Sequence, residues 1–423
     1  MNNQILQKAL DDEQQRQQEG IELIPSENYV SADVLAALGS VFTNKYSEGY
    51  PGKRYYGGQQ NTDIIEQLAI DRAKQLFGAD HANVQPHSGA QANEAVYHAW
   101  LEPGDTVLAM DLTHGGHLTH GHPITKLASQ YNFVRYKVAD TSTGGIDYDQ
   151  LRSLALEHKP KIILAGFSAY SRELDYAKFV DIGQEVGAML MADMAHIAGL
   201  IAGEALQNPL SAGFHVMTCT THKTLRGPRG GLILSMGKVG NPLVAPEKSL
   251  GNLPTLIDRM VFPGIQGGPH MNTILAKAVA FGEAMQPSFK NYAKAVLANA
   301  SELAKQLENR GFQLVFGGTD NHLLLIDMVA SKGINGKQAE EALDEIGLTA
   351  NKNSIPDDQL PAFEPSGLRF GTPALTTRGL QPEHMAQLAT WIDQAIANRS
   401  DHQKLKALQA EVKSFMASFP LPN

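Results

Sequence analysis

A lysine with several hydroxyl-bearing neighbours stands at the end of an apolar, partly β-branched run. The run 216–220 leads to Lys223, and a turn rich in Gly and Pro over 226–231 follows it. A lysine between a buried strand and such a turn is expected to be shielded from water, and burial beside other cations lowers the pKa of an amine. The neutral amine can then form a Schiff base. A solvated lysine in a surface loop is the alternative that this stretch leaves open.

Polar side chains also follow other apolar runs of the chain. Ser168, Asp193 and His196 each come soon after such a run, and segments of helical pattern lie between the runs. Alternating strands and helices predict a mostly parallel sheet. Polar residues at the carboxyl ends of parallel strands meet at one edge of the sheet, where such folds bind ligands. We therefore expect these residues near Lys223, although an acid in such a place can also serve only as a helix N-cap.

Four histidines lie within residues 114–122, directly after the apolar run 106–110. Histidines this close in sequence could bind a metal ion. The glycines between them and the missing i,i+4 helical spacing argue against a preformed metal cage, so we predict no metal site. His117, in a Gly-Gly-His loop after a strand, could instead lay its ring flat against a ligand. A metal-binding protein remains the alternative.

Small residues open a helix at 87–93. Free backbone N–H groups at a helix start, together with the helix dipole, can bind an anion. The alternative is a plain N-cap by Ser88.

The segment 44–58 contains four tyrosines, three cations and four glycines, without a helical or strand period. Binding loops often have this composition, whereas flexible linkers are dominated by Ser, Pro and Gly. We favour a binding loop, and an exposed linker is the alternative. A second glycine-rich turn spans 261–270.

The composition limits the class of protein. The chain has 423 residues and a net charge of -9, which argues against a nucleic-acid-binding surface. Cys219 is the only cysteine, so an intrachain disulfide is impossible. The N-terminal segment lacks the apolar core of a signal peptide, and no apolar run is long enough to span a bilayer. We expect a cytoplasmic protein with neither a membrane nor a nucleic acid as partner.

A chain of this length predicts more than one domain. The expected parts are an N-terminal arm and helix (1–55), a large domain (56–280) and a small C-terminal domain (281–423). The helix from about residue 272 to 285 is expected to bridge the two domains. The other expected helices cover residues 3–19, 63–77, 87–101, 292–309 and 336–346, with a last helical region from 382. The expected strands cover residues 81–85, 106–110, 161–165, 188–192, 216–220, 232–234, 313–316, 322–327 and 368–370.

Taken together, these stretches resemble serine hydroxymethyltransferase, a pyridoxal-phosphate enzyme of the aspartate-aminotransferase fold (fold type I). The segments that carry the resemblance are 23–29, 44–58, 87–93, 114–121, 216–231 and 368–373, so it runs nearly from end to end. It implies an α/β fold, in which helices cover a mostly parallel seven-stranded sheet and a smaller α/β domain follows. It also implies that the enzyme reversibly interconverts serine and glycine. The hydroxymethyl unit would pass to tetrahydrofolate, through an external aldimine of pyridoxal phosphate.

The resemblance assigns a role to each candidate residue. Lys223 would bind the cofactor covalently, Asp193 would keep the pyridine nitrogen protonated, and His117 would stack on the ring. Other catalytic groups would be Glu48, which handles a proton, and His222 and Thr220. Other cofactor contacts would come from Ser88, Gly89, Ala90, Ser168 and His196, and from Tyr46, Gly267 and Gly268 of a second chain. Substrate-binding residues would be Ser26, Glu48, Tyr55, Tyr56, Leu112, Leu118, Arg229, Asn353 and Arg369.

The resemblance further implies a homodimer, or a dimer of such dimers, with active sites shared between chains. Arg369 and Ser26 would bind the amino-acid carboxylate, and the folate pocket would be lined by Tyr55, Leu112, Leu118 and Asn353. The chain departs from the family pattern at Ala90, at Arg226 and at 270–272, which affects the expected cofactor affinity and the shape of the rim. A threonine-aldolase-type enzyme, with the same fold and cofactor but without folate, is the nearest rival.

Overall fold

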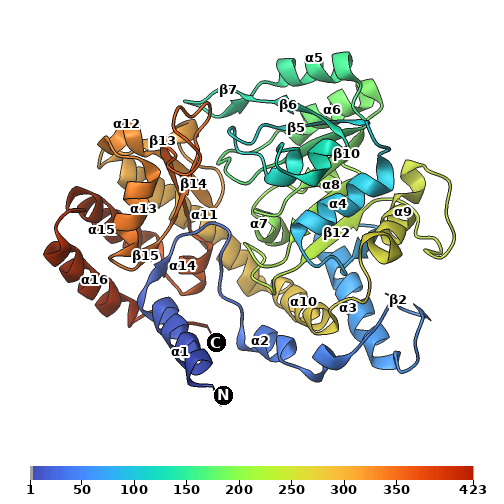
Figure 1. The fold of residues 1–423 in the computed structure, drawn as a ribbon, viewed down its shortest axis with the longest axis horizontal. Coiled ribbons are helices and arrows are strands. Elements are labelled where there is room, and N and C mark those ends of the chain that lie inside the picture. Colours follow the sequence, from blue (N-terminus) through green and yellow to red (C-terminus); the bar gives the residue numbers. More distant parts are fainter. Residues whose placement is uncertain (1–2, 423) are drawn as a thin grey trace.

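The computed structural model describes residues 3–422, and a seven-stranded sheet forms the centre of its larger unit (Figure 1). The strand order is β4-β12-β11-β10-β9-β5-β6, and only β12 runs antiparallel to its neighbours. The prediction of a mostly parallel seven-stranded sheet is therefore confirmed. The strands are β4 (His81–Asn83), β5 (Thr106–Met110), β6 (Asn132–Tyr136), β9 (Ile162–Gly166), β10 (Met189–Asp193), β11 (Val216–Thr220) and β12 (Gly231–Ser235).

Both faces of this sheet are buried. Along β5, Leu108 and Met110 belong to one apolar core, and Val107 and Ala109 belong to another. This alternation follows from the two-residue period of a strand, and burial on both faces explains why the strands are almost wholly apolar. The first face is covered by α3 (Gln60–Phe77), α5 (Tyr148–His158), α6 (Tyr176–Val186), α7 (Ala198–Ala202), α8 (Pro209–Ala212) and α10 (Met271–Ala284). The second face is covered by α4 (Gly89–Trp100) and α9 (Leu253–Arg259).

The smaller unit has its own apolar core around a four-stranded antiparallel sheet of order β13-β14-β17-β16. Its strands are β13 (Gln313–Leu314), β14 (Leu323–Asp327), β16 (Asn351–Asn353) and β17 (Gly367–Gly371). Its helices are α12 (Met328–Lys332), α13 (Gly336–Asp344), α14 (Pro373–Thr377), α15 (Met385–Ala397) and α16 (His402–Met416). The predicted strand 313–316 is shorter than expected, because residues 315–317 form a 3-10 turn.

The bridging helix differs from the one expected. The helix that begins at Met271, α10, packs against α3 and α2 (Ala32–Leu38) of the larger unit. The next helix, α11 (Pro287–Glu308), contacts α7 on one side and α14 and α15 of the smaller unit on the other. A proline at its start begins a new helix, so the connection between the units is α11.

The N-terminal arm packs on the smaller unit (Figure 1). Helix α1 (Gln4–Glu19) has no buried residue, and β1 (Ile21–Glu22) pairs in parallel with β15 (Leu348–Thr349). Arg378 of the smaller unit donates hydrogen bonds to the carbonyls of residues 17, 18 and 20. The domain boundaries at 55/56 and 280/281 stay predictions, and residues 1–2 and 423 of the first and last predicted domains lie outside the described residues.

None of the helices formed by residues 3–422 has the length and apolar character that a membrane crossing requires. The longest, α11, shows why. Its buried residues Phe289, Val296, Ala300 and Leu307 recur at helical spacing, while lysines and glutamines occupy other positions. This is the pattern of a helix with one face against a protein core.

Candidate active site

The carboxyl ends of β10 and β11 bring Asp193 and Lys223 to the same edge of the sheet, as predicted. The two strands are adjacent and parallel, with Asp193 opposite Thr218. Lys223 is buried, as is Thr220 at the end of β11. Burial lowers the pKa of Lys223 to about 8, Asp193 opposes this shift, and nearby arginines add to it. A larger fraction of this amine is therefore neutral near pH 7 than for an exposed lysine.

Three donors hold the Asp193 carboxylate in place. Oδ2 accepts from Asn93 Nδ2 at 2.8 Å and lies 3.0 Å from His120 Nε2, and Oδ1 accepts from the Ala195 N–H at 3.1 Å. Burial alone would raise the pKa of Asp193, but the hydrogen bonds from His120 and Asn93 outweigh it and hold this pKa far below its usual range. Asp193 is therefore a buried carboxylate that stays ionised. No role for Asn93 or His120 was predicted from the sequence.

His117 lies beside this carboxylate in its neutral form. Its Nδ1 accepts from the Thr119 N–H at 3.2 Å and lies 2.8 Å from the Thr119 hydroxyl. Burial lowers the pKa of His117 to about 4, against the raising effect of Asp193. A neutral imidazole with its ring fixed by Thr119 suits contact with a flat ligand.

The four histidines of 114–122 do not form one cluster. His117, His120 and Asp193 have ligand atoms within 4.8 Å of one another. However, His114 Nε2 lies 3.4 Å from Asp357 of the smaller unit. The Nδ1 of His120 accepts from the His117 N–H at 3.1 Å, and its Nε2 faces Asp193, so hydrogen bonds already occupy both ring nitrogens. The prediction of no metal site stays a prediction.

The start of α4 is capped by Ser88 and also has free N–H groups that can bind an anion. The Ser88 hydroxyl caps the helix by accepting from the Gln91 N–H at 3.3 Å. The N–H groups of Gly89 and Ala90 take no acceptor among residues 3–422, as expected of a first helical turn. A Cβ on Gly89 would lie 2.6 Å from Thr220 Cγ2, so the turn is packed directly against β11. An anion bound here would lie close to the end of β11, the strand that leads to Lys223.

Arg369, on β17, is a buried guanidinium beside the same edge. Its Nη1 donates to the Ser168 carbonyl at 2.5 Å and to the Ser168 hydroxyl at 3.3 Å, and its Nε donates to Asn351 at 3.2 Å. Burial lowers its pKa to about 10, and no carboxylate among residues 3–422 offsets this. Burying a charge without an opposite charge is costly, which indicates that this guanidinium is suited to bind an anion.

The tyrosine-rich segment forms a second cluster around Glu48. The Tyr46 hydroxyl donates to one carboxylate oxygen at 3.2 Å and the Tyr56 hydroxyl donates to the other at 3.4 Å. A Cβ on Gly268 would lie 3.0 Å from the Tyr46 ring, and one on Gly267 would lie 3.5 Å from Glu48. No hydrogen bond in residues 3–422 joins Tyr46, Glu48 or Tyr56 to the edge around Lys223.

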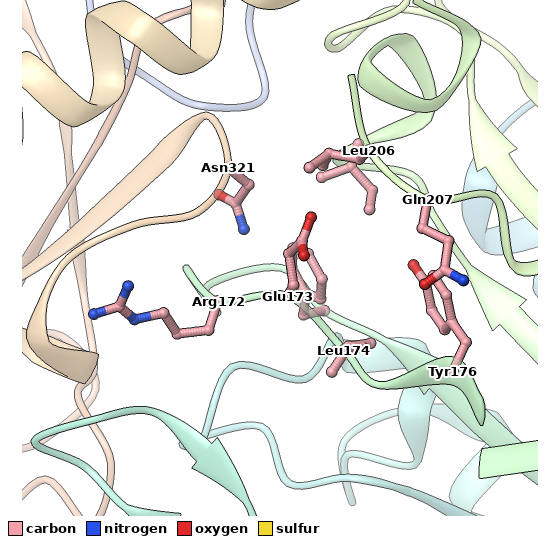
Figure 2. A pocket seen from close by; sticks show the side chains of 9 residues that line it. Arg172, Glu173, Leu174, Tyr176, Leu206, Gln207 and Asn321 are labelled. Carbon is pink, nitrogen blue, oxygen red and sulfur yellow. The ribbon is translucent and has the colours of Figure 1, made fainter. Parts of the chain in front are cut away.

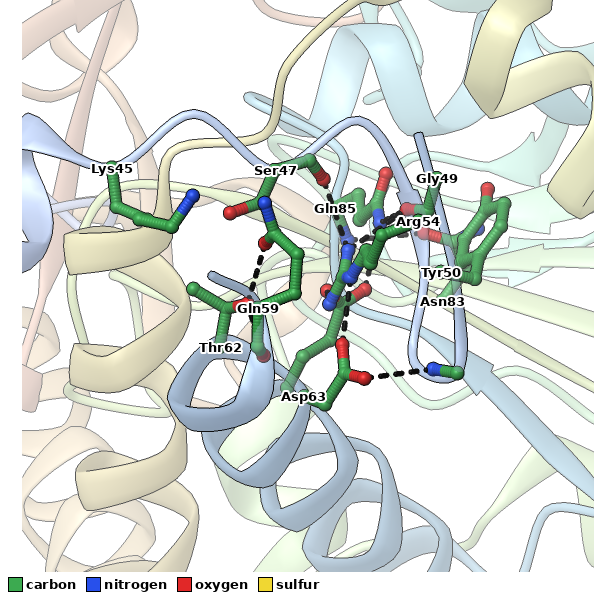
Figure 3. Close-up of polar contacts among 12 residues, drawn as sticks. Lys45, Ser47, Gly49, Tyr50, Arg54, Gln59, Thr62, Asp63, Asn83 and Gln85 are labelled. Carbon is green, nitrogen blue, oxygen red and sulfur yellow. Dashed lines mark hydrogen bonds and ion pairs between the residues drawn. The ribbon is translucent and has the colours of Figure 1, made fainter. Parts of the chain in front are cut away.

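This segment is more regular than expected, because it contains a short hairpin of β2 (Gly49–Tyr50) and β3 (Lys53–Arg54). Arg54 fixes it. One guanidinium nitrogen donates to the carbonyls of Ser47 and Gly49, on either side of Glu48, at 3.0 and 2.9 Å. The other two guanidinium nitrogens form ion pairs, with the carboxylate of Asp63 at 2.8 Å and with that of the buried Glu66 at 2.5 Å (Figure 3). The backbone of Glu48 is therefore held from both sides, although the side chains of Tyr46 and Tyr56 are more than half exposed.

A comparison with protein-family models matches residues 1–392 to Serine hydroxymethyltransferase, which covers most of the chain. The chain belongs to this family. It is therefore a pyridoxal-phosphate enzyme that transfers the hydroxymethyl group between serine and glycine, with tetrahydrofolate as the one-carbon acceptor. The fold and activity expected from the sequence are confirmed at this level. The family that matches is serine hydroxymethyltransferase, which was the expected family, and not the threonine-aldolase-type alternative.

The edge around Lys223 fits the cofactor of this family. A phosphate matches the free N–H groups of Gly89 and Ala90, a pyridinium nitrogen matches an ionised Asp193, and an aldehyde matches the partly neutral Lys223. His222 also lies here, and its buried Nδ1 has no hydrogen-bond partner among residues 3–422. Burial lowers the pKa of His222 to about 3, with Arg229, Lys223 and Lys277 contributing.

His196 lies at the same edge and has a partner that the sequence did not indicate. Its Nδ1 is 3.2 Å from Nε2 of His322, the residue before β14. Burial lowers the pKa of both imidazoles, that of His322 to about 3, and the charges of Lys223 and Arg369 add to this. Two neutral histidines therefore connect the larger and smaller units.

The residues expected to bind folate are divided between the two clusters. Leu112 and Leu118 flank His117 in the 111–122 loop, with Leu118 about half exposed. Asn353 ends β16, which pairs with the strand of Arg369. Tyr55, in contrast, belongs to the Glu48 segment and contacts Phe262 edge-on, with ring centroids 5.6 Å apart. Ser26 is half-buried, and Arg229 is exposed in the turn before β12.

Two residues at which the chain departs from the family pattern, Arg226 and His270, contact aromatic rings. Arg226 has a left-handed φ of 58°, and its guanidinium lies 4.8 Å from the centroid of the Tyr292 ring. His270 stacks on His87, with centroids 4.1 Å apart and planes 5° from parallel. Ala90 is exposed at the start of α4.

A cavity of about 20 Å³ lies near the contact between the two units, outside the Lys223 edge (Figure 2). This volume is enough for about one water molecule. Glu173 points into it, and burial together with Asp320 raises the pKa of this carboxyl. The cavity is too small for an amino acid or a cofactor.

Proposed function

We propose that the Lys223 edge binds pyridoxal phosphate and serine, and that a second copy of the chain completes the site with its Glu48 cluster. The observation that carries the substrate assignment is the buried Arg369, which pairs with no carboxylate of the described residues. Its planar fork suits a carboxylate. Ser26 would be the second carboxylate contact, and Ser168 and His196 would lie beside the cofactor.

When bound, pyridoxal phosphate supplies an aldehyde that links covalently to an amine and an electron-poor ring that stabilises negative charge at the α-carbon. Lys223 would provide the amine that the substrate displaces. Asp193, ionised and fixed by His120 and Asn93, would hold a proton on the ring nitrogen. His117, neutral and fixed by Thr119, would lie against the ring. Thr220 and His222 precede the lysine at the end of β11 and would limit the directions in which its amine can move.

Glu48 would hold or move the proton of the transferred hydroxymethyl group. Its carboxylate accepts from Tyr46 and Tyr56, and Arg54 fixes its backbone. No hydrogen bond of residues 3–422 joins this cluster to the edge around Lys223. We therefore propose a homodimer in which Glu48, Tyr46, Tyr55, Tyr56 and Gly267–Gly268 enter the neighbouring site. Leu112, Leu118 and Asn353 would meet the neighbour's Tyr55 around the folate. The expected cytoplasmic location and a further pairing of dimers stay predictions.

The activity is tested with the purified full-length chain. Serine should be converted to glycine much faster with tetrahydrofolate than without it, and threonine should be cleaved slowly in comparison. A product analysis for glycine and for the one-carbon folate measures both. Cleavage of threonine as fast as that of serine, without dependence on folate, would show an aldolase instead.

Arg369→Ala should raise the KM for serine steeply, and Arg369→Lys should restore little of the affinity. Each charge-assisted hydrogen bond contributes about 1.5–3 kcal/mol, and a single ammonium replaces two parallel bonds poorly. Steady-state kinetics with serine measure the effect, and the visible band of the bound cofactor serves as the control for an intact site. Full affinity in Arg369→Lys would contradict a two-pronged contact.

Mixing two inactive variants should restore activity if the sites are shared. Lys223→Ala chains and Tyr46→Ala chains are unfolded together in equal amounts and refolded. Random pairing makes about half of the dimers mixed, and each mixed dimer has one site with both lesions and one site with neither. Activity should return to roughly a quarter of the wild-type value per site.

A matched mixture provides the control for this experiment. Lys223→Ala and Asp193→Asn change residues of the same edge in one chain, so every site of their mixed dimers carries a lesion. This mixture should stay inactive. If the Lys223→Ala and Tyr46→Ala mixture also stays inactive after verified exchange of chains, the shared site is wrong.

A further inference from the structure

Lys277, on α10, is a buried lysine to which the proposed catalytic roles assign no function. Its side chain is 1% exposed. Its Nζ donates to three backbone carbonyls, those of Val84 at 2.6 Å, Gly231 at 2.7 Å and Pro86 at 3.1 Å. An ammonium group has three N–H donors and no acceptor, so these carbonyls use its whole hydrogen-bonding capacity. Burial lowers the pKa of Lys277 to about 7, while its three carbonyl acceptors favour the charged form, which alone has three N–H donors. A buried lysine bonded only to backbone groups indicates a specific structural task.

The three carbonyls come from the two segments that flank the proposed cofactor site. Val84 and Pro86 lie in the connection from β4 to the start of α4, directly before Ser88. Gly231 is the first residue of β12 and ends the turn that begins at Lys223. The Gly231 N–H also donates to the Pro86 carbonyl at 2.9 Å. Lys277 therefore lies where the start of α4 and the turn after Lys223 meet.

These two segments approach each other through their backbones. A Cβ on Gly231 would lie 2.3 Å from the Ser88 carbonyl oxygen, which leaves no space for a side chain. A Cβ on Gly230 would lie 2.5 Å from Cε of Lys277. Neither segment can shift toward the other, and the carbonyl bonds of Lys277 oppose a shift apart.

We propose that Lys277 is a positioning residue that fixes the phosphate-binding turn 88–90 relative to Lys223. The proposal rests on the proposed assignment of that turn to the cofactor phosphate. A ligand held at one end by the turn and at the other by Lys223 needs both groups at a set separation. Lys277 acts only through the carbonyls of Val84, Pro86 and Gly231 and makes no contact with the ligand.

The test compares two aldehydes that differ only in the phosphate. Full-length Lys277→Met, freed of cofactor, is titrated with pyridoxal 5′-phosphate and with pyridoxal, and visible absorbance is followed. The dissociation constant for pyridoxal phosphate should rise at least tenfold, or about 1.4 kcal/mol. That for pyridoxal, which has no phosphate for residues 88–90 to bind, should change little. A loss of packing alone would weaken both aldehydes to a similar degree.

Lys332→Met is the matched control. Lys332 is a lysine of the smaller unit whose Nζ donates to the Arg310 carbonyl and to Asp393, each at 2.8 Å. This variant should bind both aldehydes as the wild type does. If Lys277→Met does not fold, Gly230→Ala replaces it, because its methyl group would displace the Lys277 side chain. The same loss for the phosphate compound alone is expected.

The outcomes separate the two proposals. A wild-type chain that binds pyridoxal as tightly as pyridoxal phosphate would show that residues 88–90 do not bind the phosphate. A wild type that prefers the phosphate compound, with a variant that loses both aldehydes equally or neither, would overturn the role of Lys277 and leave the phosphate-binding turn intact.

Discussion

Lys223→Arg should fold normally and lose serine turnover completely. The guanidinium stays protonated at every pH at which the protein is folded, so it cannot form a covalent bond with an aldehyde. It keeps the positive charge that faces Asp193, which should preserve the surroundings of the site. Conversion of serine to glycine with tetrahydrofolate measures the loss, and circular dichroism measures the fold.

Lys161→Arg is the matched control, since Lys161 precedes β9 of the same sheet but is exposed. It should have wild-type activity. Borohydride treatment gives a second measurement, because it should fix the cofactor to the wild-type chain and to Lys161→Arg but not to Lys223→Arg. Normal turnover by Lys223→Arg would remove this lysine from its proposed role.

Asp193→Asn should lower the rate by several powers of ten while the cofactor still binds. The amide keeps an oxygen to accept from His120 and Asn93, so the local structure should persist. It lacks the charge that holds a proton on the ring nitrogen, and without that proton the ring stabilises the α-carbon charge poorly. The rate constant for serine at saturation and the affinity for pyridoxal phosphate are measured separately.

The control for this charge removal is Asp147→Asn. Asp147 caps α5 by accepting from the Gln150 N–H at 2.8 Å, and asparagine caps helices equally well. Its activity should match the wild type. A decrease of less than about tenfold in Asp193→Asn would contradict a pairing with the ring nitrogen, because one tenfold step corresponds to only about 1.4 kcal/mol.

The strands of the large sheet could be predicted wherever the apolar run was continuous. The strand at 106–110 has the predicted bounds, since each face of β5 is covered by a core. Strand β6 (Asn132–Tyr136) was missed as a strand, because it lies at the edge and only Tyr136 is fully buried. Its mixed sequence has neither a strict two-residue alternation nor a continuous apolar run.

The site was predictable where a residue has a local signal, such as Asp193 after an apolar strand. The partners that fix it were not. His120 and Asn93 are 73 and 100 positions away from Asp193, and a single sequence carries no sign of which distant residues meet. Lys277 does have a local signal, a lysine within the apolar run of α10, and it was overlooked. An isolated charge in such a run indicates a buried group with dedicated partners.

The pairing of β1 with β15 has a consequence for synthesis on the ribosome. Ile21 pairs with Leu348, so the segment around Ile21 cannot dock until the residues up to Leu348 have been synthesised. Contacts between residues so far apart in sequence form late, because closing the long loop between them costs entropy before the contact stabilises anything. Meanwhile all strands of the large sheet, which ends at Ser235, have already emerged. This arm leaves the ribosome before its partner strand and is therefore among the later parts to reach its native place, and an emerged β15 that β1 has not yet joined presents an edge to other extended chains.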